Sequence, residues 1–464
     1  MPAVNLDDTI AAVATPPGEG GIAVIRISGP ASFPIAGRVF RPAGGGAVSD
    51  FPSHTVHAGN ALDGEGKPID QVLLSVFRNP KSYTGQDVVE ISAHGGLGIT
   101  RKILDCILEN GARMAEPGEF TKRAFLNGKM DLTQAEAVID LIKARSEKSR
   151  ETALRQLEGA LSRKFNALRE SLMKVYAHME AFLDFPEEDL EIYSDQAFDG
   201  RFGQIKDEIR KLIASFRRGS VFREGVRCVI LGKPNAGKSS LFNALLERDR
   251  ALVSEYAGTT RDMLEECIEI GGIAVRLMDT AGLGHESTHP LDVLGSQRTR
   301  EALEGAELVL FVVDGSAALE DKDREVFSLI RQDKPVLVLV NKSDLPRKLN
   351  PAELEKITGR RDSVFLSAKS RDGMAGLERK MTDSILGQAG GGEGEEITRL
   401  RHKKALEAAL ESLERAHAAF RGRESLEIVT LDVKAALDQM SELVGEIYSE
   451  DLLDVIFSEF CIGK

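Results

Sequence analysis

The sequence predicts a chain of several domains, in which a doubly wound α/β unit is inserted into a helical region that follows a smaller α/β unit. Three observations lead to this prediction. The 464 residues exceed what one hydrophobic core usually serves, which favours two to four domains. Uninterrupted apolar runs alternate with helix-like segments after residue 225, as in a covered parallel sheet. Apolar residues at helical spacing occupy both flanks of that stretch.

The first 125 residues are predicted to form the smaller α/β unit. Short β-prone runs cover residues 22–27, 72–77 and 88–91, and glycine clusters separate them. A helix is expected over residues 100–109. This combination of short strands and one or more helices is typical of a compact α/β domain.

The helical region is expected on both sides of the insertion. One helix face is predicted for Leu154, Leu157, Leu161, Phe165, Leu168, Leu172, Val175 and Met179, which recur every three or four residues and indicate one long helix. After a Gly- and Glu-rich linker at 387–396, the same spacing returns at Leu406, Leu410, Leu413, Phe420, Leu437, Met440, Val444 and Ile447. A helix with one apolar face needs a packing partner, so the two flanks are expected to form one domain.

Between the flanks, buried parallel strands are predicted at 226–231, 275–278, 308–313 and 336–340. The expected boundaries are therefore residues 1–125 for the first domain, 126–221 and 387–464 for the helical domain, and 222–386 for the inserted domain.

Composition and charge exclude several protein classes. The chain is 42% hydrophobic and 29% charged, which is ordinary globular composition rather than that of a disordered chain. Its formal charge of -13 opposes indiscriminate phosphate binding, so a nucleic-acid substrate would require a local basic patch. The basic clusters at 217–218 and 399–404 are interpreted as solvated helix faces rather than as such a patch.

The cysteines and the apolar segments predict a protein of the reducing cytoplasm. The four cysteines are far apart and form no Cys-x-x-Cys pair, which argues against a zinc site or a disulfide framework. The beginning of the chain carries Asp7 and Asp8 where an export signal has Lys or Arg, and the longest apolar runs have strand length. No export and no stable membrane insertion are therefore expected.

The strongest chemical signal is the segment 232–239, Gly-Lys-Pro-Asn-Ala-Gly-Lys-Ser, between a predicted strand and a predicted helix. Glycines let several backbone N–H groups converge on a phosphate chain, Lys238 adds a mobile positive charge, and Ser239 offers a hydroxyl to Mg²⁺. The alternative is a Gly-rich turn without a ligand. The predicted nucleotide-binding residues of this loop are Asn235, Ala236, Gly237, Lys238, Ser239 and Ser240.

Two later segments are expected to contact the γ-phosphate and Mg²⁺. The first ends a predicted strand with Asp279, Thr280, Ala281 and Gly282; the carboxylate can hold a Mg²⁺-bound water and the glycine N–H can face the phosphate. The second contains Thr260, the better candidate for a Mg²⁺-binding hydroxyl, next to Thr259. Taken alone, two such threonines are more often turn residues.

A further pair of segments predicts which base is bound. Asn341, Lys342 and Asp344 follow a predicted strand, and the Asp344 carboxylate can accept hydrogen bonds from both the ring N–H and the exocyclic amine of guanine. Adenine presents an acceptor at the ring position, so guanine is predicted. Ser367, Ala368 and Lys369 would cover the base through main-chain N–H groups, although this tripeptide alone could be an ordinary strand end.

These five elements in one order resemble the G domain of translation-factor-like GTPases, and the rest of the chain resembles the MnmE family of tRNA modification GTPases. The segments with this likeness are 14–22, 26–29, 83–90, 94–96, 117–126, 129–136 and 460–464, the last being Phe-Cys-Ile-Gly-Lys. The resemblance implies a folate-binding N-terminal α/β domain, a helical domain and an inserted Ras-like P-loop GTPase domain with a doubly wound sheet.

The resemblance also implies a reaction and partners. The family forms homodimers through its N-terminal domains and, in a heterotetramer with the FAD-dependent protein MnmG, modifies C5 of the wobble uridine of certain tRNAs. A carboxymethylaminomethyl or aminomethyl group is added, with a one-carbon unit from 5-formyl- or methylene-tetrahydrofolate. The matching pterin contacts are Arg26, Glu90, Lys129 and Lys464, which would otherwise be ordinary surface charges. Cys461 is the matching functional thiol, although a lone cysteine beside apolar residues is more often simply packed.

For hydrolysis, the resemblance implies a potassium ion. Ras-like enzymes orient the attacking water with a Gln, but this chain has Leu283 at that position. The family instead holds K⁺ in place of an arginine finger, and a fixed cation there neutralises developing charge. The matching K⁺ positions are Asn235, Ser254, the backbone of Tyr256, and Thr259, within a nucleotide-contacting loop that also includes Glu255, Ala257 and Gly258.

The water-positioning acid is the least defined element. The family places a Glu three residues before a helix-opening glycine, and this chain has Asp292 there, one methylene shorter. Glu286 is the competing candidate, and both could be loop carboxylates without a role in catalysis. Two further function classes stay open at this stage: a ribosome-assembly GTPase that binds RNA, and a nucleotide-sensing scaffold.

Overall fold

The computed structural model describes residues 7–184, 195–249, 265–279, 297–389 and 395–464. The chain divides into two compact units. The first contains residues 1–139, 156–186 and 426–464, and the second contains residues 140–155 and 187–425. Each unit therefore combines segments that are far apart in the sequence.

The first unit contains a seven-stranded sheet in the order β3-β4-β5-β6-β2-β1-β7. Neighbouring strands are antiparallel except for the parallel pair β1 and β7. The strands are β1 (Ile10–Val13), β2 (Gly20–Ser28), β3 (Phe40–Pro42), β4 (Thr55–Leu62), β5 (Pro68–Phe77), β6 (Val88–Gly95) and β7 (Arg113–Met114). Helices α1 (Ser32–Val39) and α2 (Leu97–Glu109) contribute to the same core as the sheet, and a 3-10 helix covers Val48–Asp50. The predicted α/β domain is confirmed.

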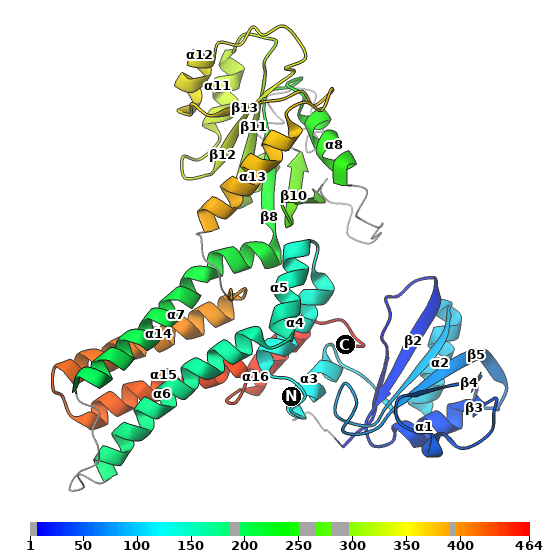
Figure 1. Ribbon diagram of the computed structural model, residues 1–464. Helices are drawn as coiled ribbons and strands as arrows, with labels where there is room; N and C mark the ends of the chain where they lie inside the picture. The colour runs from blue at the N-terminus through cyan, green and yellow to red at the C-terminus, as the bar shows by residue number, and fades with distance from the viewer. Residues whose placement is uncertain (1–6, 185–194, 250–264, 280–296, 390–394) are drawn as a thin grey trace. The chain divides into compact units, whose positions relative to one another are not determined.

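The rest of the first unit is helical, with α3 (Glu119–Leu126), the start of α4 (Leu132–Lys143), α6 (Ala160–Asp184), α15 (Leu426–Val444) and α16 (Glu450–Ser458). Helices α6 and α15 lie side by side although more than 240 residues separate their first residues (Figure 1). The predicted apolar face of α6 is buried from Leu161 to Met179. The two flanks of the insertion therefore do pack together.

Two helix ends differ from the sequence prediction. The single helix expected across residues 154–179 is wrong, because α5 (Glu147–Leu157) ends before α6 begins. Gly159, between them, has a φ of +81°, a left-handed conformation that ends regular helix and that glycine adopts without steric cost. Likewise α15 ends at Val444, followed by Gly445 at φ +81°, so Ile447 lies outside the helix and is exposed.

The second unit is built around a six-stranded sheet in the order β13-β12-β11-β8-β10-β9. All neighbours are parallel except β9 and β10. The strands are β8 (Val226–Leu231), β9 (Glu265–Ile270), β10 (Ile273–Asp279), β11 (Leu308–Asp314), β12 (Val336–Asn341) and β13 (Ser363–Phe365). The order reverses between β11 and β10 around β8, and this is where open α/β sheets place their ligands.

Helices cover both faces of this sheet (Figure 1). Cys228 and Ile230 of β8 face the core that includes α8 (Lys238–Asp249) and α13 (Met374–Ala389). Val229 and Leu231 face the opposite core with α10 (Gln297–Gly305), α11 (Asp321–Ser328) and α12 (Pro351–Thr358). Burial on both faces explains why the strands are continuous apolar runs, and the predicted doubly wound sheet is confirmed.

Two long helices, α7 (Asp195–Glu224) and α14 (Leu400–Arg421), lie side by side in the second unit (Figure 1). Some residues of the basic clusters that were predicted to be solvated form ion pairs close to these two helices. Arg218 lies 3.2 Å from Glu396, and Arg399 is buried with Nη2 2.7 Å from Asp140. The prediction of a solvated face is therefore wrong for Arg399, whereas Arg217 is exposed.

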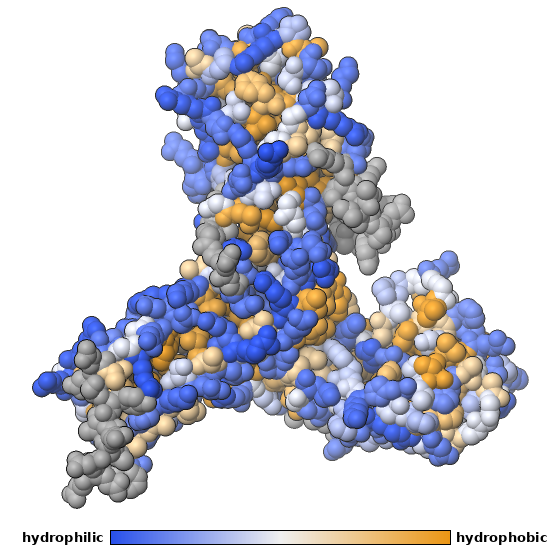
Figure 2. Space-filling view, viewed as in Figure 1, coloured by the Kyte–Doolittle hydropathy of each residue, from blue (hydrophilic) through white to orange (hydrophobic). Residues whose placement is uncertain are grey.

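The visible surfaces are mainly hydrophilic, with smaller hydrophobic areas between them (Figure 2). Within the described residues, no helix has the length and apolar character needed to cross a membrane. None of the four cysteines forms a disulfide: Cys106 and Cys228 are buried, Cys267 is partly buried and Cys461 is exposed. The domain boundaries expected from the sequence stay a prediction.

Candidate functional site

The Gly-rich loop lies at the carboxyl end of β8, between the central strand and the first turn of α8. Asn235 and Gly237 have φ angles of +65° and +95°, so the chain turns through left-handed conformations. A side chain on Gly232 would lie 2.3 Å from the carbonyl oxygen of Val312. A side chain on Gly237 would lie 2.1 Å from Nδ2 of Asn341. Both glycines are therefore required for a loop of this shape, as the sequence predicts.

Asn341 connects this loop to the segment expected to cover the base. Its Nδ2 donates to the carbonyl of Ala236 at 3.0 Å, and its Oδ1 accepts from the N–H of Ala368 at 3.0 Å. The side chain is 2% exposed, so both hydrogen bonds are shielded from water. The sequence indicated Asn341 only as part of the base-recognition segment, and the structure adds that it joins two loops 130 residues apart.

The carboxylate predicted to recognise guanine is oriented by a neighbouring loop. Ser367 donates its hydroxyl to Oδ1 of Asp344 at 2.6 Å, and this hydrogen bond holds the pKa of Asp344 below its ordinary value. Asp344 is exposed and therefore accessible to a ligand. Beside it, Lys342 donates to Asp314 at 2.6 Å, which fixes the lysine stem across the end of β11. Ser367 and Ala368 are buried, whereas Lys369 is exposed.

The loop lysine, Lys238, is held by the loop itself. Its Nζ donates to the carbonyl of Lys233 at 3.0 Å, and its side chain is 7% exposed. The side chain of Lys233 in turn lies 3.0 Å from Oδ2 of Asp323, which also accepts from the N–H of Glu320 at the start of α11. Burial alone would lower the pKa of Lys233, but the carboxylates of Asp323 and Glu320 together outweigh burial and raise that pKa. Sequence inspection missed this pair, because 90 residues separate its members.

Several predicted residues fall outside the described part of the chain. These are Ser254, Glu255, Tyr256, Ala257, Gly258, Thr259, Thr260, Thr280, Ala281, Gly282, Glu286 and Asp292. Asp279 is the last residue of β10, so only its backbone position at the carboxyl edge of the sheet is described. The Gly-rich loop and the segments that follow β12 and β13 lie at this same edge of the sheet.

A second cluster of predicted residues lies in the first unit. Arg26 of β2 and Glu90 of β6 are directly paired across the sheet, and Nε of the arginine lies 2.8 Å from Oε1 of the glutamate. The Arg26 guanidinium also lies 5.5 Å from the ring centres of Tyr83 and Phe120. Burial, together with the Arg26 charge, lowers the pKa of Lys464, while Glu90 opposes this shift. Three of the four predicted pterin contacts therefore lie together.

The last residues of the chain are fixed beside this cluster. Nη1 of Arg26 donates to the carbonyl of Gly463 at 3.3 Å, and Ile462 forms a β-bridge with Pro117. Gly463 has a φ of +98°, and a side chain there would lie 2.2 Å from the carbonyl oxygen of Val13. Cys461 is exposed, so its thiol is accessible, in contrast to a packed cysteine.

The fourth predicted contact, Lys129, is exposed and makes a different contact. Its Nζ donates to the carbonyl of Pro80 at 3.0 Å, at the start of the loop that carries Tyr83. The stem of Lys129 also lies beside Gly85, whose added side chain would approach Cγ within 3.3 Å. Lys129 thus contacts the same loop as the cluster, but no direct contact with the other three residues is described.

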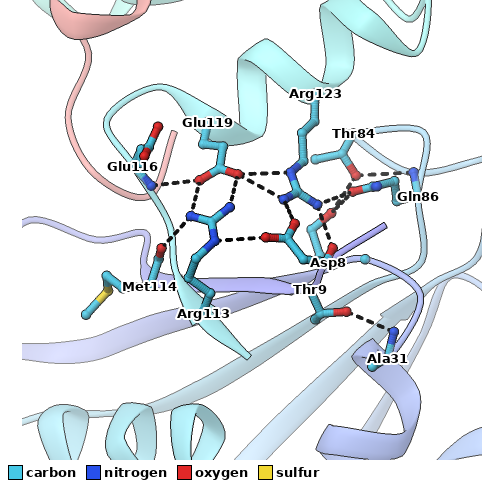
Figure 3. A network of polar contacts seen from close by, with 12 residues as sticks. Asp8, Thr9, Ala31, Thr84, Gln86, Arg113, Met114, Glu116, Glu119 and Arg123 are labelled. Atoms are coloured by element: carbon cyan, nitrogen blue, oxygen red, sulfur yellow. Dashed lines mark hydrogen bonds and ion pairs between the residues drawn. The ribbon is translucent and has the colours of Figure 1, made fainter. Parts of the chain in front are cut away.

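A partly buried ionic network lies beside the first sheet, and sequence inspection did not find it (Figure 3). Arg123 is fully buried and bonds to Glu119, Asp8 and Gln86. Arg113 makes a second pair with Glu119, at 2.7 Å, and also contacts Asp8. Burial opposes ionisation of Glu119, but the two arginines keep the pKa of Glu119 below its ordinary value. Such a closed network ties α3 to the start of β1.

Comparison with known proteins assigns the family. Residues 9–129 match the family model described as the GTP-binding protein TrmE N-terminus, and residues 132–461 match the MnmE helical domain. The chain belongs to the MnmE family. A relative from Carboxydothermus hydrogenoformans, named tRNA modification GTPase MnmE, is 44% identical over 462 residues, which cover 99% of this chain and 100% of the relative. A relative of the same name from Moorella thermoacetica is also 44% identical, over 467 residues, with 99% and 100% covered.

Membership of the MnmE family agrees with the resemblance drawn from the sequence motifs. The two matched models together begin before β1 and end in the Phe-Cys-Ile-Gly-Lys tail. An N-terminal α/β domain, a helical domain and an inserted doubly wound domain are all present in the described structure. The fold class predicted from the sequence is therefore confirmed.

Proposed function

We propose that this chain binds and hydrolyses GTP and uses the cycle to modify the C5 position of the wobble uridine in certain tRNAs. The observation that carries the proposal is the double hydrogen bond of Asn341, which joins the Gly-rich loop to the base-covering segment. The loop that would bind the phosphates and the carboxylate that would select guanine therefore lie at one edge of the sheet. Family membership supports the tRNA substrate.

In this proposal the chain's own groups hold the nucleotide. The backbone N–H groups of residues 235–240 face the phosphates, and Lys238 moves from the Lys233 carbonyl to a phosphate oxygen. Ser239 and Thr260 provide hydroxyls for Mg²⁺, and Asp279 orients a water bound to that ion. Asp344, oriented by Ser367, accepts the two N–H donors of guanine.

One residue of the described loop, Asn235, could be a ligand of K⁺. Asn235 is exposed and makes no side-chain hydrogen bond within the described ranges, so its amide oxygen is available to a cation. Ser254, the Tyr256 backbone and Thr259 would complete the ion's ligands. A cation there would offset charge that develops between the phosphates during hydrolysis. Asp292, with Glu286 as the alternative, would orient the attacking water.

The Arg26 cluster fits a tetrahydrofolate derivative. Glu90 already accepts a guanidinium N–H from Arg26, and the edge of a pterin presents the same kind of donors. Lys464 and Lys129 would bind the acceptor groups of the same molecule. Bound 5-formyl- or methylene-tetrahydrofolate would supply the one-carbon unit, and the exposed Cys461 would act as a thiol in that reaction.

The proposed assembly is cytoplasmic. Two copies of the chain form a homodimer through their N-terminal domains, and the dimer joins the FAD-dependent protein MnmG in a heterotetramer that accepts tRNA. GTP hydrolysis drives approach of the two G domains. Reconstitution with MnmG, tRNA, GTP and folate, followed by nucleoside analysis of the wobble position, tests the modification itself.

The first experiment is GTP hydrolysis by the full chain in matched buffers of K⁺ or Na⁺, with Asn235→Ala beside the wild type. We expect strong stimulation by K⁺ that the variant loses. Asn243→Ala, at an exposed position of α8, is the matched control and should keep the K⁺ response. Equal rates in both salts would refute the K⁺ role, and no hydrolysis in either salt would refute the GTPase proposal.

A further inference from the structure

A chain of hydrogen-bonded ionisable groups joins α7 to α14 outside the sites described above. Nζ of Lys206 on α7 bonds to Nδ1 of His417 on α14. Nε2 of the same imidazole lies 2.7 Å from Oδ1 of Asp199, which precedes Lys206 by about two turns of α7. The ring of His417 stacks on Phe202, with ring centres 5.0 Å apart. The imidazole therefore has a fixed orientation between an amine and a carboxylate.

The neighbours of His417 determine which nitrogen carries its proton. Asp199 can only accept when ionised, so Nε2 of the imidazole donates to it. An arginine, Arg421 on α14, binds both oxygens of Asp199 and keeps the pKa of Asp199 below its ordinary value. Nδ1 is then the acceptor for Lys206. A histidine in this tautomer is a base directed at the lysine nitrogen.

The surroundings of Lys206 lower the pKa of its amine, and burial is the largest cause. On its own helix it faces Asp199 and Arg210, and on α14 it faces His417, Glu414 and Arg421. Burial and then the Arg210 charge lower the pKa of Lys206, while Glu414 and Asp199 oppose the shift. Lys206 is partly buried, and its base, His417, is 6% exposed. The base is thus shielded from water while the amine stays partly accessible.

We propose that Lys206 is a reactive amine and a site of covalent acylation by small acyl phosphates. The amine lone pair of Lys206 attacks the carbonyl carbon of the acyl phosphate, and a carbon–nitrogen bond forms. The bond from that carbon to the phosphate oxygen breaks, and inorganic phosphate leaves. His417 takes the proton released by the nitrogen and passes it to the departing phosphate. An amide and hydrogen phosphate are the products, with no change of oxidation state.

Acylation would change the contact between α7 and α14. Acylation replaces the amine of Lys206 with a bulkier amide that has a single N–H and cannot take up a proton, so the hydrogen bond to His417 and the packing between the two helices change. Helix α7 continues from Lys206 to Glu224, and only Gly225 separates it from β8. The modification would therefore act on the helix that leads into the strand before the Gly-rich loop.

The test compares two lysines of one helix in the intact full-length chain. Lys211, also on α7, is the matched control: its side chain is 73% exposed, and a hydrogen bond to Glu208 raises its pKa. The protein is incubated with acetyl phosphate at pH 8, and acetylation is followed over time by peptide mass spectrometry. We expect Lys206 to react about tenfold faster or more, despite its lower exposure, because His417 accepts the proton that the amine releases. Equal or slower reaction at Lys206 would overturn the proposal.

Variants then test the role of the base. His417→Gln keeps a hydrogen-bonding group but removes the basic nitrogen, and we expect the Lys206 rate to fall to that of Lys211. Asp199→Asn should lower the Lys206 rate less, because it removes only the group that orients the imidazole. In both variants the Lys211 rate serves as the internal control for folding and reagent. An unchanged Lys206 rate in a folded His417→Gln protein would show that His417 is no base.

Discussion

Two groups of buried charges in this protein have opposite designs. The network around Arg123 is closed, since its arginines and carboxylates bond to one another and Arg123 is fully buried. The charges around the Gly-rich loop form an open chain. The buried Asp323 accepts a hydrogen bond from the amine of Lys233, and the backbone carbonyl of Lys233 accepts one from the amine of Lys238.

This difference indicates that the first group stabilises the fold and the second group serves ligand binding. A closed network lowers the energy of one conformation, and a bound ligand would only disturb it. In the second group Lys238 donates to a neutral backbone carbonyl, and a phosphate oxygen is a stronger acceptor for a lysine than a neutral carbonyl. We therefore expect substitutions in the first network to change stability, and those in the second to change nucleotide binding.

The largest effect is expected for Arg123→Met. Among the described residues, its removal leaves Arg113 as the remaining cationic partner of Glu119 and Asp8, and an incompletely paired buried charge costs about 3–5 kcal/mol of folding free energy. Calorimetric unfolding of the full chain measures the change. Arg101→Met is the control in the same unit, because its ion pair with Asp105 is 85% and 57% exposed and should contribute under about 1 kcal/mol.

Similar small effects of both arginine substitutions would contradict the closed-network interpretation. GTP binding gives a second check. Arg123→Met should leave the affinity for GTP unchanged at a temperature where the variant is still folded. A specific loss of GTP affinity would mean that the two designs are not separate.

The next largest effect is expected for Gly237→Ala. The added methyl group would meet Nδ2 of Asn341 at 2.1 Å, and alanine is strained at a φ of +95°. Asn341 can move only by giving up its hydrogen bonds to both loops. We expect GTP affinity to fall about 100-fold, or about 2.7 kcal/mol, in equilibrium binding of a fluorescent GTP analogue. Gly376→Ala, in α13 with open space around the new methyl group, should bind GTP like the wild type.

A smaller effect is expected for Asp323→Asn. The variant removes the charged partner of Lys233, whose carbonyl positions Lys238, while Glu320 still lies 3.4 Å from the Lys233 amine. We expect KM for GTP to rise about tenfold, as for about 1.4 kcal/mol of lost binding, with kcat nearly unchanged. Steady-state hydrolysis measures both constants, and Asp321→Asn at an exposed neighbouring position is the control. A fall in kcat without a change in KM would place Asp323 in the chemical step instead.

The sequence predicted the open chain far better than the closed network. Gly237, Lys238 and Asp344 lie in short segments of fixed spacing, because phosphate and guanine recognition require particular residues close together in the chain. Asp8 and Arg123 are 115 residues apart, and no local pattern connects a carboxylate at one end of a domain with an arginine at the other.

Helix ends were also difficult to predict, for a local reason. Gly159 is compatible with a helix at moderate cost, so the apolar spacing on either side of it looked continuous. Only its left-handed backbone separates α5 from α6. The interpretation of the 399–404 cluster as solvated failed similarly for Arg399, because the sequence does not show that Asp140 reaches this arginine.

Glu396 is a buried carboxylate with two arginine partners, and it tests whether such pairing is enough to stabilise the folded protein. It is 4% exposed and lies 3.2 Å from both Arg155 and Arg218, yet burial outweighs these arginines and raises its pKa. A carboxyl whose folded-state pKa is raised adds stability that is full below its unfolded pKa, about 4.3, and is lost as pH rises through the folded value. The free energy of unfolding should therefore fall with rising pH in that window.

The variant Glu396→Gln, which cannot ionise, should remove this decline. Its free energy of unfolding at pH 7 should equal that of the wild type or exceed it by under about 1 kcal/mol. Lower stability of the variant at pH 7 would mean that the two arginines do compensate for burial, and that Glu396 belongs with the closed network.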